Sequence, residues 1–218
     1  MPGDRGAVGE RNETPMLIFT SPTTPFGRKV MVLIREAGLT DAVQVQDVTG
    51  TPLTPGTLPV DHNPLGKIPA LVCDDGRVLY DSRVVCRYLD HLAGAGLYPD
   101  VPFLWEILTL EATADGILDA AVLMAYEQRL RPEDLRYPDW LEAQWAKIAR
   151  ALDAIEAQWL DQLQGPLNMA QIALGCALGY LDLRHVVRNW RAGRPKLAAW
   201  EVEFAKRPSM QATKPPPV

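Results

Sequence analysis

The hydrophobic pattern of this chain changes its period near residue 94, and this change limits the folds open to it. Before that point, short apolar runs of strand length stand among two stretches with helical spacing, at residues 25–37 and 82–93. After it, strand signals stop and long amphipathic patterns follow, at residues 104–130, 140–163, 168–187 and 195–206. This segregation predicts a small α/β domain followed by an all-helical domain.

The order of elements in the first part narrows the α/β class. It runs strand, helix, strand, long loop, strand, strand, helix, with strands expected at residues 17–20, 43–48, 70–73 and 78–80. This order resembles that of a thioredoxin-like domain. We therefore expect a disordered extension over residues 1–15, a thioredoxin-like domain over 16–95 and an all-helical C-terminal domain over 103–210, whose first helix breaks near Gly116.

Composition and charge exclude several classes of function. Hydrophobic residues make up 47% of the chain, which is typical of a globular protein. The formal net charge is -5 and no basic block is present, so we expect no nucleic-acid partner. No apolar run reaches the length of a membrane span, so we expect no membrane association. Cys73, Cys86 and Cys176 lack metal-ligand spacing, which favours reduced buried thiols, a cytoplasmic protein and no bound metal.

The strongest local signal is the segment 63–71, which reads Asn-Pro-Leu-Gly-Lys-Ile-Pro-Ala-Leu. It predicts a turn that leads into a short strand. We expect the bond before Pro69 to be cis, which would leave the backbone of Ile68 facing a pocket and free to pair with an extended ligand. Further on, Asp81 and Ser82 predict a helix start, whose free N–H groups can bind a carboxylate. The two signals together predict a site for a peptide that carries a carboxylate.

Four segments resemble the glutathione S-transferase family, and in particular its bacterial members. They lie at residues 24–30, 63–69, 81–82 and 170–181, and read TPFGRKV, NPLGKIP, DS and AQIALGCALGYL. No segment is specific alone, but their order and spacing together are. The resemblance implies glutathione as co-substrate, a small hydrophobic electrophile as second substrate and a two-fold homodimer.

The family places its thiol-activating group at the start of the first helix. The resemblance maps this group to Thr24, with Ser21 as the second candidate. No Tyr or Cys lies within residues 20–29, which favours hydroxyl-type members of the family. An O–H donor and the dipole of a helix N-terminus both favour a thiolate, because both stabilise the charged form. Thr24 is also compatible with a plain helix N-cap before Pro25.

The resemblance also assigns the contacts with glutathione. Asp81 and Ser82 would hold the γ-glutamyl carboxylate. The Ile68 backbone would pair with the cysteinyl part, and Lys67 would approach the glycyl carboxylate, although a solvated charge explains Lys67 equally well. The full expected set is Thr24, Phe26, Lys67, Ile68, Pro69, Asp81 and Ser82.

The remaining candidates have a structural interpretation beside the functional one. Arg28 and Lys29 are interpreted as a solvated helix face. Arg129 and Arg131 are either surface charges or part of an anionic acceptor site. The electrophile pocket is expected on the first long helix of the second domain, where core packing explains the same stripe: Ile117, Leu118, Ala121, Met124 and Ala125. The histidines are interpreted as structural or exposed: His62, His91 and His185.

Three functions remain open at this point. The first is a glutathione transferase that acts on small apolar electrophiles. The second is a glutathione-dependent reductase of disulfides or peroxides. The resemblance leaves this function open, because hydroxyl-type members can catalyse such a reduction without an enzyme cysteine. The third is a non-catalytic module for dimer formation or binding, which the presence of both ligand segments disfavours. The fold alone does not decide among them.

Overall fold

A computed structural model describes residues 15–217, and its four-stranded sheet confirms the expected thioredoxin-like order. The strands lie in the order β2-β1-β3-β4, with β1 parallel to β2, and β3 antiparallel to both β1 and β4. Their bounds are β1 Met16–Thr20, β2 Val43–Asp47, β3 Ala70–Val72 and β4 Val78–Leu79.

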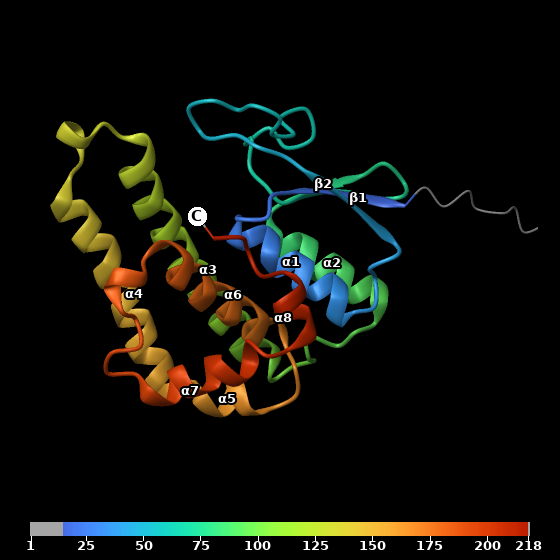
Figure 1. Ribbon diagram of the computed structural model, residues 1–218. Coiled ribbons are helices and arrows are strands. Elements are labelled where there is room, and N and C mark those ends of the chain that lie inside the picture. Colours follow the sequence, from blue (N-terminus) through green and yellow to red (C-terminus); the bar gives the residue numbers. More distant parts are fainter. Residues whose placement is uncertain (1–14, 218) are drawn as a thin grey trace, which may run out of the picture.

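Two helices, α1 (Pro25–Glu36) and α2 (Ser82–Ala93), lie side by side on one face of this sheet (Figure 1). Successive side chains of a strand point to opposite faces. Ile18 therefore packs in the core beneath the two helices, while Phe19 packs on the other face with Leu58 of the long loop after β2. The alternation of β1 thus fixes which face receives the helices.

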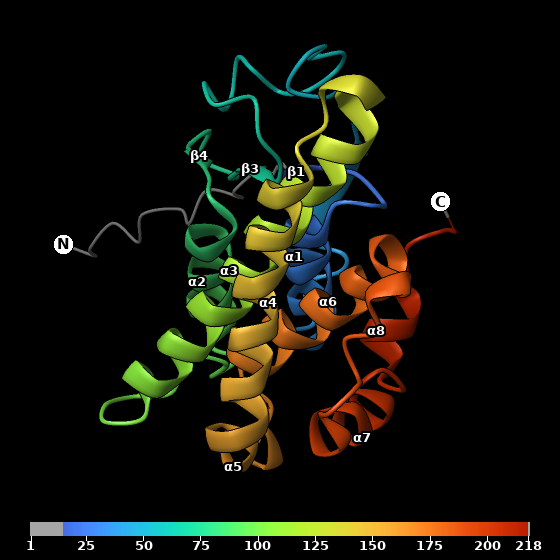
Figure 2. The ribbon, with the colours of Figure 1, turned by 90° about the vertical axis from the view of Figure 1, so that its left-hand side faces the viewer.

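The rest of the chain is helical, and α6 lies at its centre (Figures 1 and 2). One side of α6 packs in the bundle core with α3, and the other side packs in the core of the sheet domain. Within residues 15–217, no helix is both long and apolar enough to cross a membrane. The bounds are α3 Leu104–Leu130, α4 Pro138–Gln158, α5 Leu160–Gln164, α6 Met169–Arg184, α7 Pro195–Phe204 and α8 Pro208–Ala212, with 3-10 turns η1 Glu133–Leu135 and η2 Val186–Arg188.

The helix bounds correct some details of the sequence prediction. The break expected near Gly116 was wrong, because α3 runs through it. Gly116 is exposed. A glycine within a helix costs about 1 kcal/mol relative to alanine, and the packing of the flanking turns outweighs this cost. The pattern at 140–163 is divided at Trp159 into α4 and α5, and α8 was not predicted. The extension expected over residues 1–15 lies outside the described residues, apart from residue 15.

Candidate functional site

Three predicted site segments meet at one end of the sheet. The antiparallel pairing of β1 with β3 places Phe19 opposite Ala70, so the loop after β1 lies beside the segment before β3. The pairing of β3 with β4 places Leu71 opposite Leu79, which brings the start of α2 to the same end. The register therefore gathers residues 21–24, 67–69 and 81–82.

The turn before β3 is held by the buried side chain of Asn63, whose Nδ2 donates to the carbonyl of Lys67 at 2.8 Å. Gly66 in this turn has φ +59, a conformation that favours glycine. The Ile68–Pro69 bond is cis, as the sequence predicted. Ile68 lies outside β3, and neither its N–H nor its C=O forms a backbone hydrogen bond with the described residues. Both groups are therefore open to a ligand.

The start of α2 offers a second set of donors. Asp81 is the N-cap, and its carboxylate accepts the backbone N–H of Arg83 at 2.8 Å. Ser82 occupies the first helical position and is only 3% exposed. The first turn of α2 contains no acidic residue. The N–H groups and the dipole of this turn can therefore bind a carboxylate.

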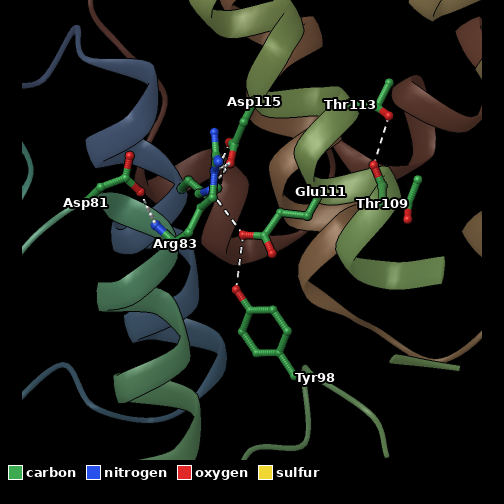
Figure 3. Close-up of polar contacts among 8 residues, drawn as sticks. Asp81, Arg83, Tyr98, Thr109, Glu111, Thr113 and Asp115 are labelled. Carbon is green, nitrogen blue, oxygen red and sulfur yellow. Dashed lines mark hydrogen bonds and ion pairs between the residues drawn. The ribbon is translucent and has the colours of Figure 1, made fainter. Parts of the chain in front are cut away.

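A network of charged residues, buried except for Arg83, lies behind this helix start and joins the two domains (Figure 3). Arg83 Nε donates to Asp115 Oδ2 at 2.7 Å. Lys29 Nζ donates to both carboxylate oxygens of Asp115 at 2.9 Å and to Glu111 Oε1 at 3.1 Å. The Tyr98 hydroxyl donates to Glu111 at 3.0 Å. Helices α1, α2 and α3 therefore meet in a set of two cations and two carboxylates.

Lys29 is fully buried, so its interpretation as part of a solvated helix face was wrong. Burial alone lowers the pKa of a lysine, but the carboxylates of Asp115 and Glu111 outweigh this effect and raise the pKa of Lys29 above its usual value. Burial raises the pKa of Glu111, and the charge of Lys29 acts against that rise. Lys29 is therefore an ammonium ion whose removal would leave the two buried carboxylates with Arg83 as the one cation in the network.

The start of α1 is built differently. Thr24 is the N-cap and Pro25 occupies the first helical position, but the Thr24 hydroxyl makes no hydrogen bond to the described helix that follows. Gly27 allows this turn to approach β1 closely, because a Cβ at this position would overlap the side chains of Thr20 and Thr24. The Thr24 hydroxyl thus stands at a helix start and is not used as a cap.

The two candidate hydroxyls, Thr24 and Ser21, border different hollows. Thr24 borders a small one with Tyr180 and Cys176 of α6, with a volume of about 10 Å³, room for about one water molecule. Burial raises the pKa of Cys176 to about 11, so it is a neutral thiol there at neutral pH. Ser21 borders a larger hollow of about 160 Å³, which reaches Asp47 of β2.

The other predicted contacts are placed as follows. Phe26 packs against the bundle core. The Lys67 side chain is exposed, near Asp119 of α3, a carboxylate that the sequence had not singled out. Burial raises the pKa of Asp119, and the charges of Arg83 and Lys67 act against that rise. Asp119 therefore lies near the charges of Arg83 and Lys67, beside the start of α2.

The residues proposed for the electrophile pocket lie in the interior of the bundle. Their side chains are at most 4% exposed, and most belong to the core cluster shared by α3 and α6. Core packing, the alternative interpretation, accounts for these positions, and their contact with an acceptor stays a prediction. The residues are Ile117, Leu118, Ala121, Met124 and Ala125.

The remaining candidates are structural or exposed. Arg129 is exposed, and Arg131 pairs with Glu127 at 2.8 Å. Arg28, which was also assigned to a solvated face, is half-buried and donates to the carbonyl of Met210 at 3.1 Å, so that assignment was wrong. All three cysteines are free and buried, as expected. His62 and His91 are exposed, while His185 is buried with a ring nitrogen 2.9 Å from the carbonyl of Ala121.

A thioredoxin-like domain followed by a helical domain, with these segments at one sheet end, is the arrangement of glutathione transferases. Residues 23–92 match the family model of the glutathione S-transferase N-terminal domain, and residues 138–201 match that of the C-terminal domain. The uncharacterized GST-like protein YibF of Escherichia coli (strain K12) is 34% identical over 205 residues, which cover 92% of this chain and 99% of YibF. The chain belongs to the glutathione S-transferase family.

Solved structures of relatives have the same fold. A glutathione transferase family member from Pseudomonas fluorescens Pf-5, with bound glutathione, is 47% identical with a TM-score of 0.90, covering 92% of this chain and 99% of that one. A glutathione S-transferase from Methylobacillus flagellatus KT, with glutathione bound, is 37% identical with a TM-score of 0.82, and the match covers 92% of this chain and 100% of that one. The predicted combination of a thioredoxin-like and a helical domain is confirmed.

Proposed function

We propose that this chain binds glutathione at the gathered end of the sheet and activates its thiol for attack on a small apolar electrophile. One observation supports this most: the same sheet end presents the open backbone of Ile68, the start of α2 at Ser82 and the uncapped hydroxyl of Thr24. A tripeptide with a thiol and two carboxylates needs such partners. The Pseudomonas and Methylobacillus relatives were solved with bound glutathione.

Each part of glutathione has a proposed partner. The γ-glutamyl carboxylate binds at Asp81 and Ser82, where the N–H groups of α2 point outward. The ammonium group beside that carboxylate binds Asp119. The cysteinyl part pairs with the Ile68 backbone ahead of Pro69, and the glycyl carboxylate lies near Lys67. Phe26 packs against the bundle core, and from there it supports the turn that carries the thiol site.

The thiol is activated by Thr24, as in hydroxyl-type members of the family. A free thiol has a pKa of about 8.5 and is mostly protonated at neutral pH. The Thr24 O–H donates to the sulfur, and the N-terminus of α1 adds a positive potential; both lower the pKa of the thiol. The thiol loses its proton to water; the thiolate then forms a bond to carbon of the electrophile, and the leaving group departs with the electron pair of the carbon bond that breaks. Ser21 is the alternative donor.

Reduction of disulfides or peroxides is the second candidate function. In that reaction the same thiolate would attack sulfur or oxygen. Attack on carbon is favoured by a second structure of the Pseudomonas relative, 46% identical to this chain, which contains S-(propanoic acid)-glutathione. In that compound the sulfur is bonded to carbon. We also propose a two-fold homodimer, whose interface would bury more than about 1,200 Å².

Equilibrium binding of glutathione to Ser82→Ala tests the proposed site. Loss of one hydrogen bond to a carboxylate should weaken binding by about tenfold and raise KM, with a smaller effect on kcat. Ser209→Ala is the matched control, since Ser209 is also buried but lies in α8 and donates to Glu36 of α1. If both variants bind glutathione like the wild type, the start of α2 is not the carboxylate site.

An assay panel then separates the reactions. A chloronitroaromatic compound reports attack on carbon, an organic peroxide reports attack on oxygen, and hydroxyethyl disulfide reports attack on sulfur. We expect the highest kcat/KM with the chloronitroaromatic compound. Tight glutathione binding without turnover of any of the three would instead favour the non-catalytic binding module.

A further inference from the structure

The larger hollow lies at the β2 edge of the sheet, whereas α2 starts after β4 at the other edge. It has a volume of about 160 Å³ and lies between the end of β1, β2, α1 and the residues after α8. Three cations border it, Arg28 and Arg35 from α1 and Lys214 from the C-terminal segment. Apart from Ser21, the alternative thiol donor, none of the residues proposed to bind glutathione borders this hollow.

The charges around this hollow are unbalanced. In the described part of the chain, the side chains of Arg35 and Lys214 form no ion pair and no hydrogen bond. Arg28 donates to the carbonyl of Met210, a neutral partner. Asp47 is the sole carboxylate in the described lining. Three positive charges thus face one negative charge, in a chain whose formal net charge is -5.

Three residues that carry a hydroxyl group border the same hollow: Thr20, Ser21 and Thr213, whose hydroxyl already donates to the carbonyl of Ser209 at 2.8 Å. Thr20, at the end of β1, is only 3% exposed, and its Oγ1 has no hydrogen-bond partner among residues 15–217. Ser21 follows it directly. A buried hydroxyl without a partner is uncommon in native structures and calls for a ligand or a water molecule. The hollow therefore combines excess positive charge with a bordering residue, Thr20, whose buried hydroxyl lies against Gly27 of α1 and has no partner in the described part of the chain.

We propose that this hollow binds a tetrahedral oxyanion, either inorganic phosphate or the phosphate group of a small metabolite. The guanidinium groups of Arg28 and Arg35, the Lys214 ammonium and the hydroxyls of Thr20 and Ser21 supply more donors than the two oxygens of a carboxylate can use. A phosphate group has three or four oxygens to meet them. The bound anion joins α1 to the C-terminal segment, whose residue Pro215 borders the hollow at Thr24.

A phosphorus NMR titration of the full chain at constant ionic strength, balanced with chloride, tests this site. Arg35→Gln should weaken phosphate binding by about ten- to a hundredfold, the effect of losing one charged hydrogen bond. Asp47→Asn should tighten binding by about two- to fivefold, because it removes the opposing charge. Arg150→Gln is the matched control: it changes the net charge equally at an exposed site on α4 and should leave binding unchanged.

The same titration with glycerol phosphate distinguishes the two sources of the anion. Tighter binding of the monoester would identify a phosphorylated metabolite, and tighter binding of phosphate would identify the free ion; both support the site. The proposal is overturned if Arg35→Gln and Arg150→Gln behave alike, or if phosphate binds no better than chloride. Each variant is first compared with the wild type in its melting temperature without phosphate, so that unfolding is not mistaken for lost binding.

Discussion

Two helix starts face the same end of the sheet and are built in opposite ways. At α2, the Asp81 carboxylate caps the backbone N–H of Arg83, and the Arg83 side chain is bound to the buried Asp115. At α1, the Thr24 hydroxyl bonds no N–H of the described helix that follows it. A side chain therefore caps one start, while at the other the hydroxyl makes no bond to the described helix.

This difference suits the two tasks of the proposed reaction. A carboxylate keeps its charge throughout, so its site gains from donors held in a fixed position. A thiol must lose a proton, so its site needs a donor that favours the charged form. The buried network would then serve binding by positioning α2, and Thr24 would serve ionisation.

The largest effect is expected from Lys29→Met, which removes the ammonium behind the start of α2. Asp115 and Glu111 would stay buried with too little positive charge, and breaking a buried ion pair costs about 3–5 kcal/mol. Urea unfolding should show a loss of this size. Lys196→Met, at an exposed lysine of α7, is the control and should cost less than about 0.5 kcal/mol. Equal losses would show that the network does not anchor α2.

The next effect is expected from Thr24→Val, which keeps the shape of the side chain and removes the donor. The pKa of the bound thiol should rise, so kcat at neutral pH should fall by about ten- to a hundredfold and recover as the pH is raised. The pH–rate profile with a chloronitroaromatic substrate measures both changes.

Two further variants complete this test of Thr24. Thr113→Val makes the same substitution on α3, where the hydroxyl bonds the carbonyl of Thr109, and should leave the profile in place. Ser21→Ala tests the rival donor. If Thr24→Val leaves the profile unchanged and Ser21→Ala shifts it, the two hydroxyls exchange roles. If neither shifts it, backbone N–H groups of α1 hold the thiolate.

Much of this comparison could be predicted from neighbouring residues. The cap at Asp81, the cis bond before Pro69 and the order of strands each depend on a few consecutive side chains. The same holds for the start of α6, where Asn168 and Gln171, three residues apart, form a capping box. Such features are local, and local patterns are what a single sequence displays.

The network behind α2 could not be predicted in the same way. Lys29 and Asp115 are 86 residues apart, and only the packing of α1 against α3 brings them together. One signal was present: Lys29 stands one turn before the buried Leu33, in register with the apolar face of α1. A charged side chain in that register is either solvated at the edge of the apolar face or buried with an ion-pair partner. Which of the two occurs depends on whether another element supplies that partner.

The smallest expected effect concerns stability at the two caps and tests the comparison most directly. Asp81→Ala removes a side chain that bonds the N–H of Arg83, and loss of such a cap costs about 1 kcal/mol. Thr24→Val removes a hydroxyl that bonds no N–H of the described α1, so it should cost less than about 0.5 kcal/mol. Urea unfolding of both variants without glutathione measures the difference. Equal costs would mean that Thr24 caps α1 in solution, and its hydroxyl would then have to leave the helix before it could donate to a thiol.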